Sequence, residues 1–311
     1  MSVLYTFPGQ GAQKPGMLHA LPGHPETVRT LDEASGALGR DLRALDTEAA
    51  LRSTVAVQLC LLVAGVAMAR VLAAHDARPQ MVAGLSIGAW PAAVTAGVLA
   101  FHDAVRLVEL RARLMEEAYP SGYGMTAIGG LTRQQLAPLV AAVHAADRPV
   151  YLANLNAARQ IVIAGQDGAM KAVARLALAQ GAQRAERLAV AVPSHCELFD
   201  EQARTLACAM DQVALQRPTI TYISSSAARA MFDARRVGSD LAANMAHPVL
   251  WADTVRHAWE RGARLALELP SGSVLTKLAA PELPDGVALS CEGARLDSLV
   301  QAVRGASAPG A

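Results

Sequence analysis

The sequence has few aromatic residues and almost no net charge. Phe, Trp and Tyr make up 4% of its 311 residues, and 28 basic residues nearly balance 27 acidic ones, for a net charge of +1. Nucleic-acid binding needs clustered Lys and Arg to neutralise phosphates, and single strands also need aromatic rings on which bases stack. The sequence offers neither a basic cluster nor such a platform, so we expect no nucleic-acid partner.

Cysteine is also scarce, and no C-x-x-C pair occurs among Cys60, Cys196, Cys208 and Cys291. Disulfide scaffolds and zinc sites use regularly or closely spaced cysteines. The scattered pattern therefore predicts a reduced, cytoplasmic compartment and no metal site.

No hydrophobic run has the features of a signal peptide or a membrane span. Residues 2–8 are a short apolar segment without a charged n-region. The stretch from Val55 to Ala74 is the most apolar, but Gln58 and Arg70 interrupt it and no flanking charge pattern supports insertion. We predict a buried core helix there and no membrane partner.

Apolar residues, in contrast, are abundant at 52%, against 18% charged residues, which predicts a globular protein with a large core. The stretch Gly84-Leu85-Ser86-Ile87-Gly88 follows a short apolar run and precedes an alanine-rich segment. G-x-S-x-G between a strand and a helix is typical of a nucleophile elbow, where the helix start directs N–H groups at a developing oxyanion. Ser86 is therefore the candidate nucleophile.

A second chemical signal lies on the predicted helix 101–119. Its apolar residues fall on one face at 100° per residue, and Arg111 lies in the middle of that face. A buried guanidinium needs a partner. A structural salt bridge is one interpretation; a bidentate clamp for a substrate carboxylate is the other.

Residues 124–192 change the pattern to the order β-α-β-β-α-β, which is typical of a ferredoxin-like unit. We predict this unit as a small domain inserted into an α/β-hydrolase-like large domain with a parallel sheet, formed by residues 1–123 and 193–311. A ligand site is expected in the cleft between the two parts. The tail 304–311 is expected to be flexible. Further predicted elements are strands at 3–7, 184–192, 219–224 and 265–269 and helices at 25–38, 47–75, 238–245 and 252–261.

The chain returns to the large domain through Pro193-Ser194-His195-Cys196. At this junction His195 can reach across the cleft to Ser86 as a general base. Cys196 is a rival nucleophile in principle, but no neighbouring residue in the sequence would activate its thiol.

Together these residues resemble the malonyl-CoA:acyl carrier protein transacylase family over nearly the whole chain. The resemblance rests on several motifs in order, with 25 residues from the serine to the arginine: Phe7-Pro8-Gly9-Gln10-Gly11-Ala12-Gln13, the Ser86 elbow, Val108-Glu109-Leu110-Arg111, Asn154-Leu155-Asn156, Val192-Pro193-Ser194-His195-Cys196 and Pro248-Val249-x-Trp251.

The resemblance implies a ping-pong transfer without a bound cofactor, from malonyl-CoA through a malonyl-serine to a carrier's pantetheine-type thiol. It assigns the nucleophile to Ser86, the base to His195 and the carboxylate contact to Arg111. The backbone N–H groups of Gln10 and Ile87 would form the oxyanion hole. The main-chain carbonyl that orients the histidine falls, by this match, at Leu250.

Two positions depart from the family, which usually has histidine before the nucleophile and glutamate three residues after it. This chain has Leu85 and Ala89. A G-L-S-I-G-A elbow in a separate chain looks most like the epsilon subunit of malonate decarboxylase, which loads a carrier subunit bearing a dephospho-CoA derivative. Association with other decarboxylase subunits is then expected.

Three alternatives remain open at this point. One is the fatty-acid or polyketide malonyl-CoA:carrier transacylase. A serine esterase or thioesterase would share Ser86 and His195 but has no use for a buried arginine. A catalytically silent interaction subunit would keep the fold and lose the chemistry.

Overall fold

The computed structural model of the chain describes residues 2–307, which form ten strands and eleven α-helices. The strands are β1 (Ser2–Phe7), β2 (Met81–Gly84), β3 (Tyr123–Gly129), β4 (Val150–Ala157), β5 (Gln160–Gln166), β6 (Arg184–Arg187), β7 (Thr221–Ser224), β8 (Arg229–Met231), β9 (Ala263–Glu268) and β10 (Val287–Ser290). The helices are α1 (Pro25–Leu38), α2 (Thr54–Ala74), α3 (Ala89–Thr95), α4 (Phe101–Ala118), α5 (Arg133–Val143), α6 (Asp167–Ala179), α7 (Asp200–Met210), α8 (Ala234–Ala243), α9 (Trp251–Glu260), α10 (Val274–Ala279) and α11 (Leu296–Ser307).

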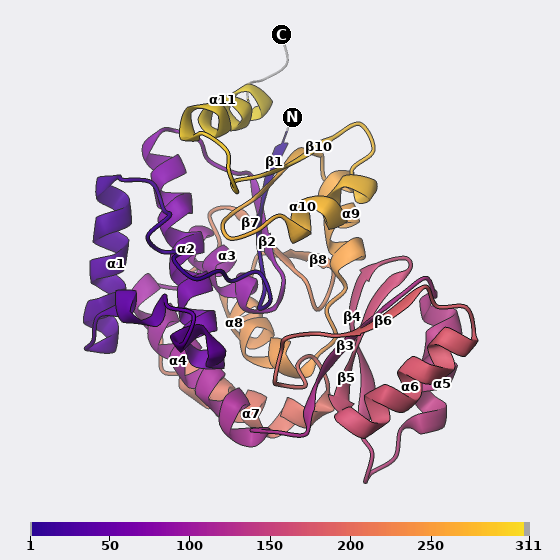
Figure 1. Cartoon of the computed structure of the whole chain (residues 1–311). Helices are drawn as coiled ribbons and strands as arrows, with labels where there is room; N and C mark the ends of the chain where they lie inside the picture. The colour runs from indigo at the N-terminus through magenta and orange to yellow at the C-terminus, as the bar shows by residue number, and fades with distance from the viewer. Residues whose placement is uncertain (1, 308–311) are drawn as a thin grey trace.

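The larger sheet has six strands in the order β10-β9-β1-β2-β7-β8 and lies at the centre of the molecule (Figure 1). Five of these strands run parallel, because helices connect them and return the chain to the same edge. β8 pairs antiparallel with β7, since only residues 225–228 separate the two strands. The predicted α/β class is confirmed, with the correction that the sheet is mixed at this edge.

The helix α2 is the core of the larger part. It is apolar on all sides, long enough by composition to cross a membrane, and 89% of its most apolar window is buried inside the protein. It packs against α1, α3 and α4. The prediction of a buried core helix is confirmed, although the helix begins at Thr54 and not at residue 47.

The smaller sheet is antiparallel, in the order β4-β5-β3-β6, and α5 and α6 cover its outer face (Figure 1). The predicted β-α-β-β-α-β unit is confirmed, and a capping box between Thr132 and Gln135 begins α5. Its last strand is shorter than predicted, because the chain leaves the sheet after Arg187. The division of the chain into domains at 123 and 192 stays a prediction.

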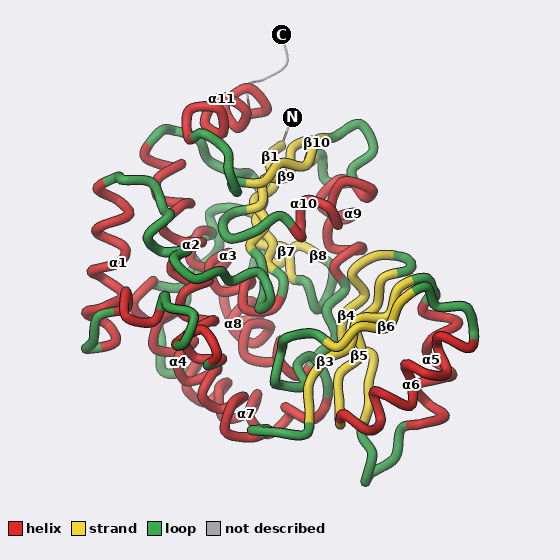
Figure 2. Tube along the Cα trace, viewed as in Figure 1, coloured by secondary structure: helices red, strands yellow, loops and turns green. Residues whose placement is uncertain are grey.

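Backbone hydrogen bonds join the smaller sheet, at β4, to the segment that precedes α9 in the larger part of the chain. Leu155 N donates to Val249 O at 2.8 Å, and Val249 N donates to Ala153 O at 2.9 Å. β4 therefore lies beside the segment that leads into α9 (Figure 2). This join holds the smaller sheet against one end of the larger one.

The C-terminal part contains structure that the sequence did not predict. β10 extends the large sheet, and α11 buries Leu299, Val300 and Val303. The predicted flexible tail is wrong for Arg304 to Ser307, which belong to α11; residues 308–311 lie outside the described part of the chain.

We predict that Gly88→Ala destabilises the fold. A Cβ at this position would overlap the backbone carbonyl of Phe7 at the end of β1, where no flexible side chain can yield. The expected loss is about 2–4 kcal/mol in the free energy of unfolding, measured by urea denaturation.

Gly36→Ala is the matched control, because Gly36 lies inside α1 and nothing surrounds its Cβ position within 4 Å. It should raise stability by about 0.5–1 kcal/mol. Equal changes in the free energy of unfolding for the two substitutions would contradict the close contact between Gly88 and the Phe7 carbonyl.

Candidate active site

Ser86 lies at a sharp turn between β2 and α3. Its backbone φ is 58°, a left-handed conformation that residues other than glycine rarely adopt. A Cβ at Gly84 would overlap the backbone of Gly88, so the turn is tight enough to require glycine at both positions. The serine is 8% exposed and lines a pocket. The local geometry is that of a nucleophile elbow.

Arg111 lies on α4 with its side chain fully buried (0% exposed). Nη1 donates to Gln58 Oε1 at 2.5 Å and Nη2 to Ser86 Oγ at 3.5 Å, while the buried Nε has no partner among the described residues. Within residues 2–307 no carboxylate pairs with this guanidinium, so the structural salt bridge left open by the sequence is not formed. Burial lowers the pKa of Arg111 to about 9, which still leaves it charged at neutral pH.

A charge buried without a counter-ion is costly, and a ligand carboxylate would relieve that cost. Gln58 is uncharged, so it does not neutralise Arg111, but its Oε1 fixes the position of Nη1. Among the described residues no side chain neutralises this charge, and Nη2 is the donor that lies beside the Ser86 oxygen. Gln58 was visible in the sequence only as a polar interruption of an apolar helix.

His195 is also strained and buried, with φ at 67° and 1% of its surface exposed. Its Nδ1 lies 2.8 Å from Asn244 O and 3.2 Å from His247 O. Carbonyl oxygens only accept, so the network assigns the hydrogen to Nδ1 and leaves Nε2 as the free base.

Burial lowers the pKa of His195 to about 4, and the charge of Arg111 adds to this shift. The two carbonyl hydrogen bonds act in the opposite direction but do not offset the loss of solvation. The imidazole is therefore neutral at physiological pH and can accept a proton.

The predicted role of Leu250 is wrong. Its carbonyl accepts from Thr254 N at 2.9 Å and Thr254 Oγ1 at 2.7 Å, in the first turn of α9. The carbonyls that hold His195 belong to Asn244 and His247, in the segment between α8 and α9. Any residue type can supply a carbonyl, so no side-chain pattern could have indicated these two positions.

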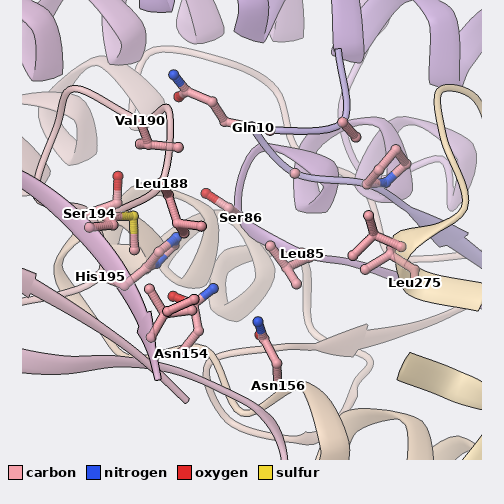
Figure 3. A pocket seen from close by; sticks show the side chains of 18 of the residues that line it. Gln10, Leu85, Ser86, Asn154, Asn156, Leu188, Val190, Ser194, His195 and Leu275 are labelled. Carbon is pink, nitrogen blue, oxygen red and sulfur yellow. The ribbon is translucent and has the colours of Figure 1, made fainter. Parts of the chain in front are cut away.

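Gln10 lies in the turn that follows β1, and this turn packs directly on Leu85, because a Cβ at Gly9 would meet the Leu85 side chain. Ile87 follows the nucleophile in the first turn of its helix, where N–H groups have no intrahelical acceptor. Gln10 and Ser86 line the same pocket (Figure 3). The two backbone N–H groups remain the predicted oxyanion hole.

The pocket has a volume of about 290 Å³ and lies between the two sheets. Its polar lining comes from both parts of the chain, and Figure 3 shows these side chains around Ser86: Gln10, Asn154, Asn156, Ser194 and His195. In the described part of the chain, the buried amide oxygens of Asn154 and Asn156 have no hydrogen-bond partner. The apolar lining includes Leu85, Met125, Leu188, Val190 and Leu275. Sequence reasoning gave Leu188 and Val190 no role in a site.

Cys196 is not an activated nucleophile. Its Sγ is buried 3.1 Å from Pro193 O, and burial raises the pKa of the thiol to about 12. Among residues 2–307 no group of three or more His, Cys, Asp or Glu side chains is placed to hold a metal ion.

Sequence comparison finds relatives that cover almost the whole chain. The malonyl CoA-acyl carrier protein transacylase of Haemophilus influenzae is 37% identical over 293 residues, which are 92% of this chain and 93% of that protein. The Bacillus subtilis protein of the same name is 32% identical over 281 residues, 89% of each chain.

Solved structures agree with the sequence comparison. The malonyl CoA-acyl carrier protein transacylase of Coxiella burnetii superposes with a TM-score of 0.92 at 32% identity, covering 98% of this chain and 97% of that one. A malonyl-transacylase solved in complex with a holo type II polyketide acyl-carrier protein gives a TM-score of 0.90 at 34% identity, covering 98% and 100%. The family model described as "acyl transferase domain" matches residues 4–296. Since this match spans both sheets and every residue of the site, the chain belongs to the acyl transferase domain family.

Proposed function

We propose that this protein transfers a malonyl group from malonyl-CoA to the pantetheine-type thiol of an acyl carrier protein. The observation that carries the proposal is the buried, uncompensated guanidinium of Arg111, 3.5 Å from the oxygen of Ser86. A malonyl thioester has a carbonyl for the serine and, two carbons away, a carboxylate for the arginine. An acetyl group has only the first.

The first half-reaction begins when His195 Nε2 takes the proton of Ser86 and the serine oxygen attacks the thioester carbonyl. The N–H groups of Gln10 and Ile87 hold the oxyanion, and Arg111 holds the malonyl carboxylate. The C–S bond then breaks, and the CoA thiolate leaves with the proton from His195. In the second half-reaction the carrier thiol follows the same steps in reverse and frees Ser86.

The acceptor is the finer part of the proposal. The relatives described above carry the transacylase name, and one was solved with its acyl-carrier protein. We therefore favour an acyl carrier protein over the decarboxylase carrier subunit suggested by Leu85 and Ala89. The role in malonate decarboxylase, with its partner subunits, stays a prediction. All four cysteines are free thiols, which supports the proposed cytoplasmic location.

The two remaining alternatives fit the site less well. A serine esterase gains nothing from an arginine whose burial costs stability. A silent interaction subunit would have no reason to keep strained backbone at both Ser86 and His195, since strain of this kind persists mainly at functional sites.

We predict that the protein forms a malonyl adduct with malonyl-CoA and little adduct with acetyl-CoA. Ser86→Ala should abolish the adduct. Arg111→Ala should lower the rate of malonylation by roughly 30-fold or more, because a buried charged hydrogen bond is lost. Intact mass after rapid mixing measures both effects.

Arg113→Ala is the matched control on the same helix, because Arg113 is exposed and pairs only loosely with Glu117 at 3.9 Å. Its malonylation should stay within twofold of the parent protein's rate. If Arg111→Ala loads malonyl at that same rate, the carboxylate clamp is wrong.

The pH dependence of acylation should reflect the depressed pKa of His195. Between pH 5 and 7 the rate of acylation by a neutral ester such as p-nitrophenyl acetate should be flat, and it should fall only as pH approaches about 4, where His195 gains a proton. Arg111→Ala removes one cause of the low pKa and should move the acid limb to higher pH. Burst kinetics measure this, and an acid limb near pH 6.5 in the parent protein would contradict the assignment.

Transfer to a carrier tests the second half-reaction. A purified malonyl-enzyme should lose its adduct to a holo acyl carrier protein, which gains the malonyl mass, and should keep it in the presence of the apo carrier, which lacks the thiol. Transfer only to a carrier with a dephospho-CoA-derived group would instead favour the malonate decarboxylase role.

A further inference from the structure

The segment from Leu188 to Pro193 has two roles in the site. It begins where β6 ends, and its residues Leu188, Ala189 and Val190 line the pocket. It then continues directly into Ser194 and His195. Figure 3 shows Leu188 and Val190 among the side chains that line this pocket with Ser86 and His195.

This wall segment is outside the regular sheet. Leu188 N still donates to Met125 O of β3 at 3.0 Å, but the carbonyls of Leu188 and Val190 both accept from one side chain. Arg187 Nη1 donates to Leu188 O at 2.8 Å, to Val190 O at 2.9 Å and to Met125 O at 3.2 Å. Nη2 donates to Tyr123 O at 2.7 Å. One guanidinium thus ties two carbonyls of the wall to two carbonyls of β3.

The position of the guanidinium is built into the fold. It lies over Gly124, where any Cβ would overlap its Nη2 and Cζ atoms. Asp167 Oδ1, at the start of α6, accepts from Nε at 3.2 Å and lies 3.1 Å from Nη2. Only arginine has a fork of fixed donors wide enough to span these carbonyls.

The ion pair between Arg187 and Asp167 contributes less to this arrangement than the hydrogen bonds from Arg187 to the carbonyls. Arg187 and Asp167 have 41% and 39% of their side chains exposed, and a pair so exposed contributes little to stability. The carbonyl contacts, in contrast, decide where an apolar part of the pocket lies. That part faces a serine ester in the proposed cycle.

We propose that Arg187 is a positioning residue that keeps the Leu188–Val190 wall closed over the acyl-serine and so protects the intermediate from water. This inference rests on the proposed malonyl transfer. In the reaction that is suppressed, water adds to the ester carbonyl and gives its proton to His195. The bond to the Ser86 oxygen then breaks, that oxygen takes the proton, and malonate leaves. Water exclusion of this kind decides between transfer and hydrolysis.

The test measures the lifetime of the malonyl-enzyme after free malonyl-CoA and CoA have been removed by desalting, with intact mass as the readout. Arg187→Met should shorten this lifetime by roughly threefold or more, with release of free malonate. Arg187→Lys restores one charge and part of the hydrogen bonding, so its lifetime should lie between those of the parent and the methionine variant.

Two controls separate the carbonyl contacts from charge alone. Asp167→Asn removes the ion pair and leaves the carbonyl contacts, and Arg175→Met removes an exposed arginine from α6. Both should keep the parent lifetime within twofold. A lifetime that Arg187→Met does not change, or that Asp167→Asn shortens equally, would overturn the proposal.

Methyl-labelled NMR spectra of Leu188 and Val190 give a readout that does not depend on activity. Their signals should shift or broaden in Arg187→Met and stay in place in the two controls. Unchanged signals in Arg187→Met would overturn the inference even without an adduct. Failure of the parent protein to form any adduct would instead count against the proposed function.

Discussion

The site depends on one electrostatic constraint, which is a positive charge buried beside a serine without a counter-ion. Arg111 has no exposed surface, and within residues 2–307 its hydrogen-bond partners are Gln58 and Ser86 alone. The packed core around α2 and α4 leaves this charge no route to solvent, so the rest of the fold must supply the stability that offsets its cost. The same charge helps to keep His195 neutral, so the protonation of the imidazole is coupled to the charge of Arg111. A carboxylate ligand would relieve the arginine and complete the site.

The histidine and the smaller sheet are held by backbone groups. Carbonyls at Asn244 and His247 fix the histidine, and the backbone bonds between β4 and Val249 fix the smaller sheet next to them. The pocket exists because these two parts meet there. Its polar lining from β4 and its apolar wall at Leu188 and Val190 come from the smaller part, while Ser86 comes from the larger one, with Arg111 behind it. Neither part alone contains a site.

Much of this arrangement was predictable from the sequence, and the reasons are local. Gly84 and Gly88 mark the elbow because only glycine fits so tight a turn, and Arg111 is conspicuous because helical periodicity places it among apolar neighbours. The β-α-β-β-α-β order follows from short-range patterning in the same way. The errors also have physical causes. β8 has only three residues, too few to give a clear strand pattern. The pattern of residues 188–192 predicts a strand, but the sheet ends at Arg187. The apolar face of α11 was not recognised.

The sequence by itself determined which side chains could do chemistry, because residue type and periodicity are encoded within a few turns or strands. It also determined the α/β class and the family resemblance. Only the tertiary structure decided that Arg111 has no carboxylate partner, that Asn244 and His247 and not Leu250 orient the histidine, and that Arg187 holds a pocket wall. Each of these points depends on which segments far apart in the chain meet, or on which backbone carbonyl a side chain contacts. Carbonyls are the same in every residue, so their use becomes visible only when the chain is folded.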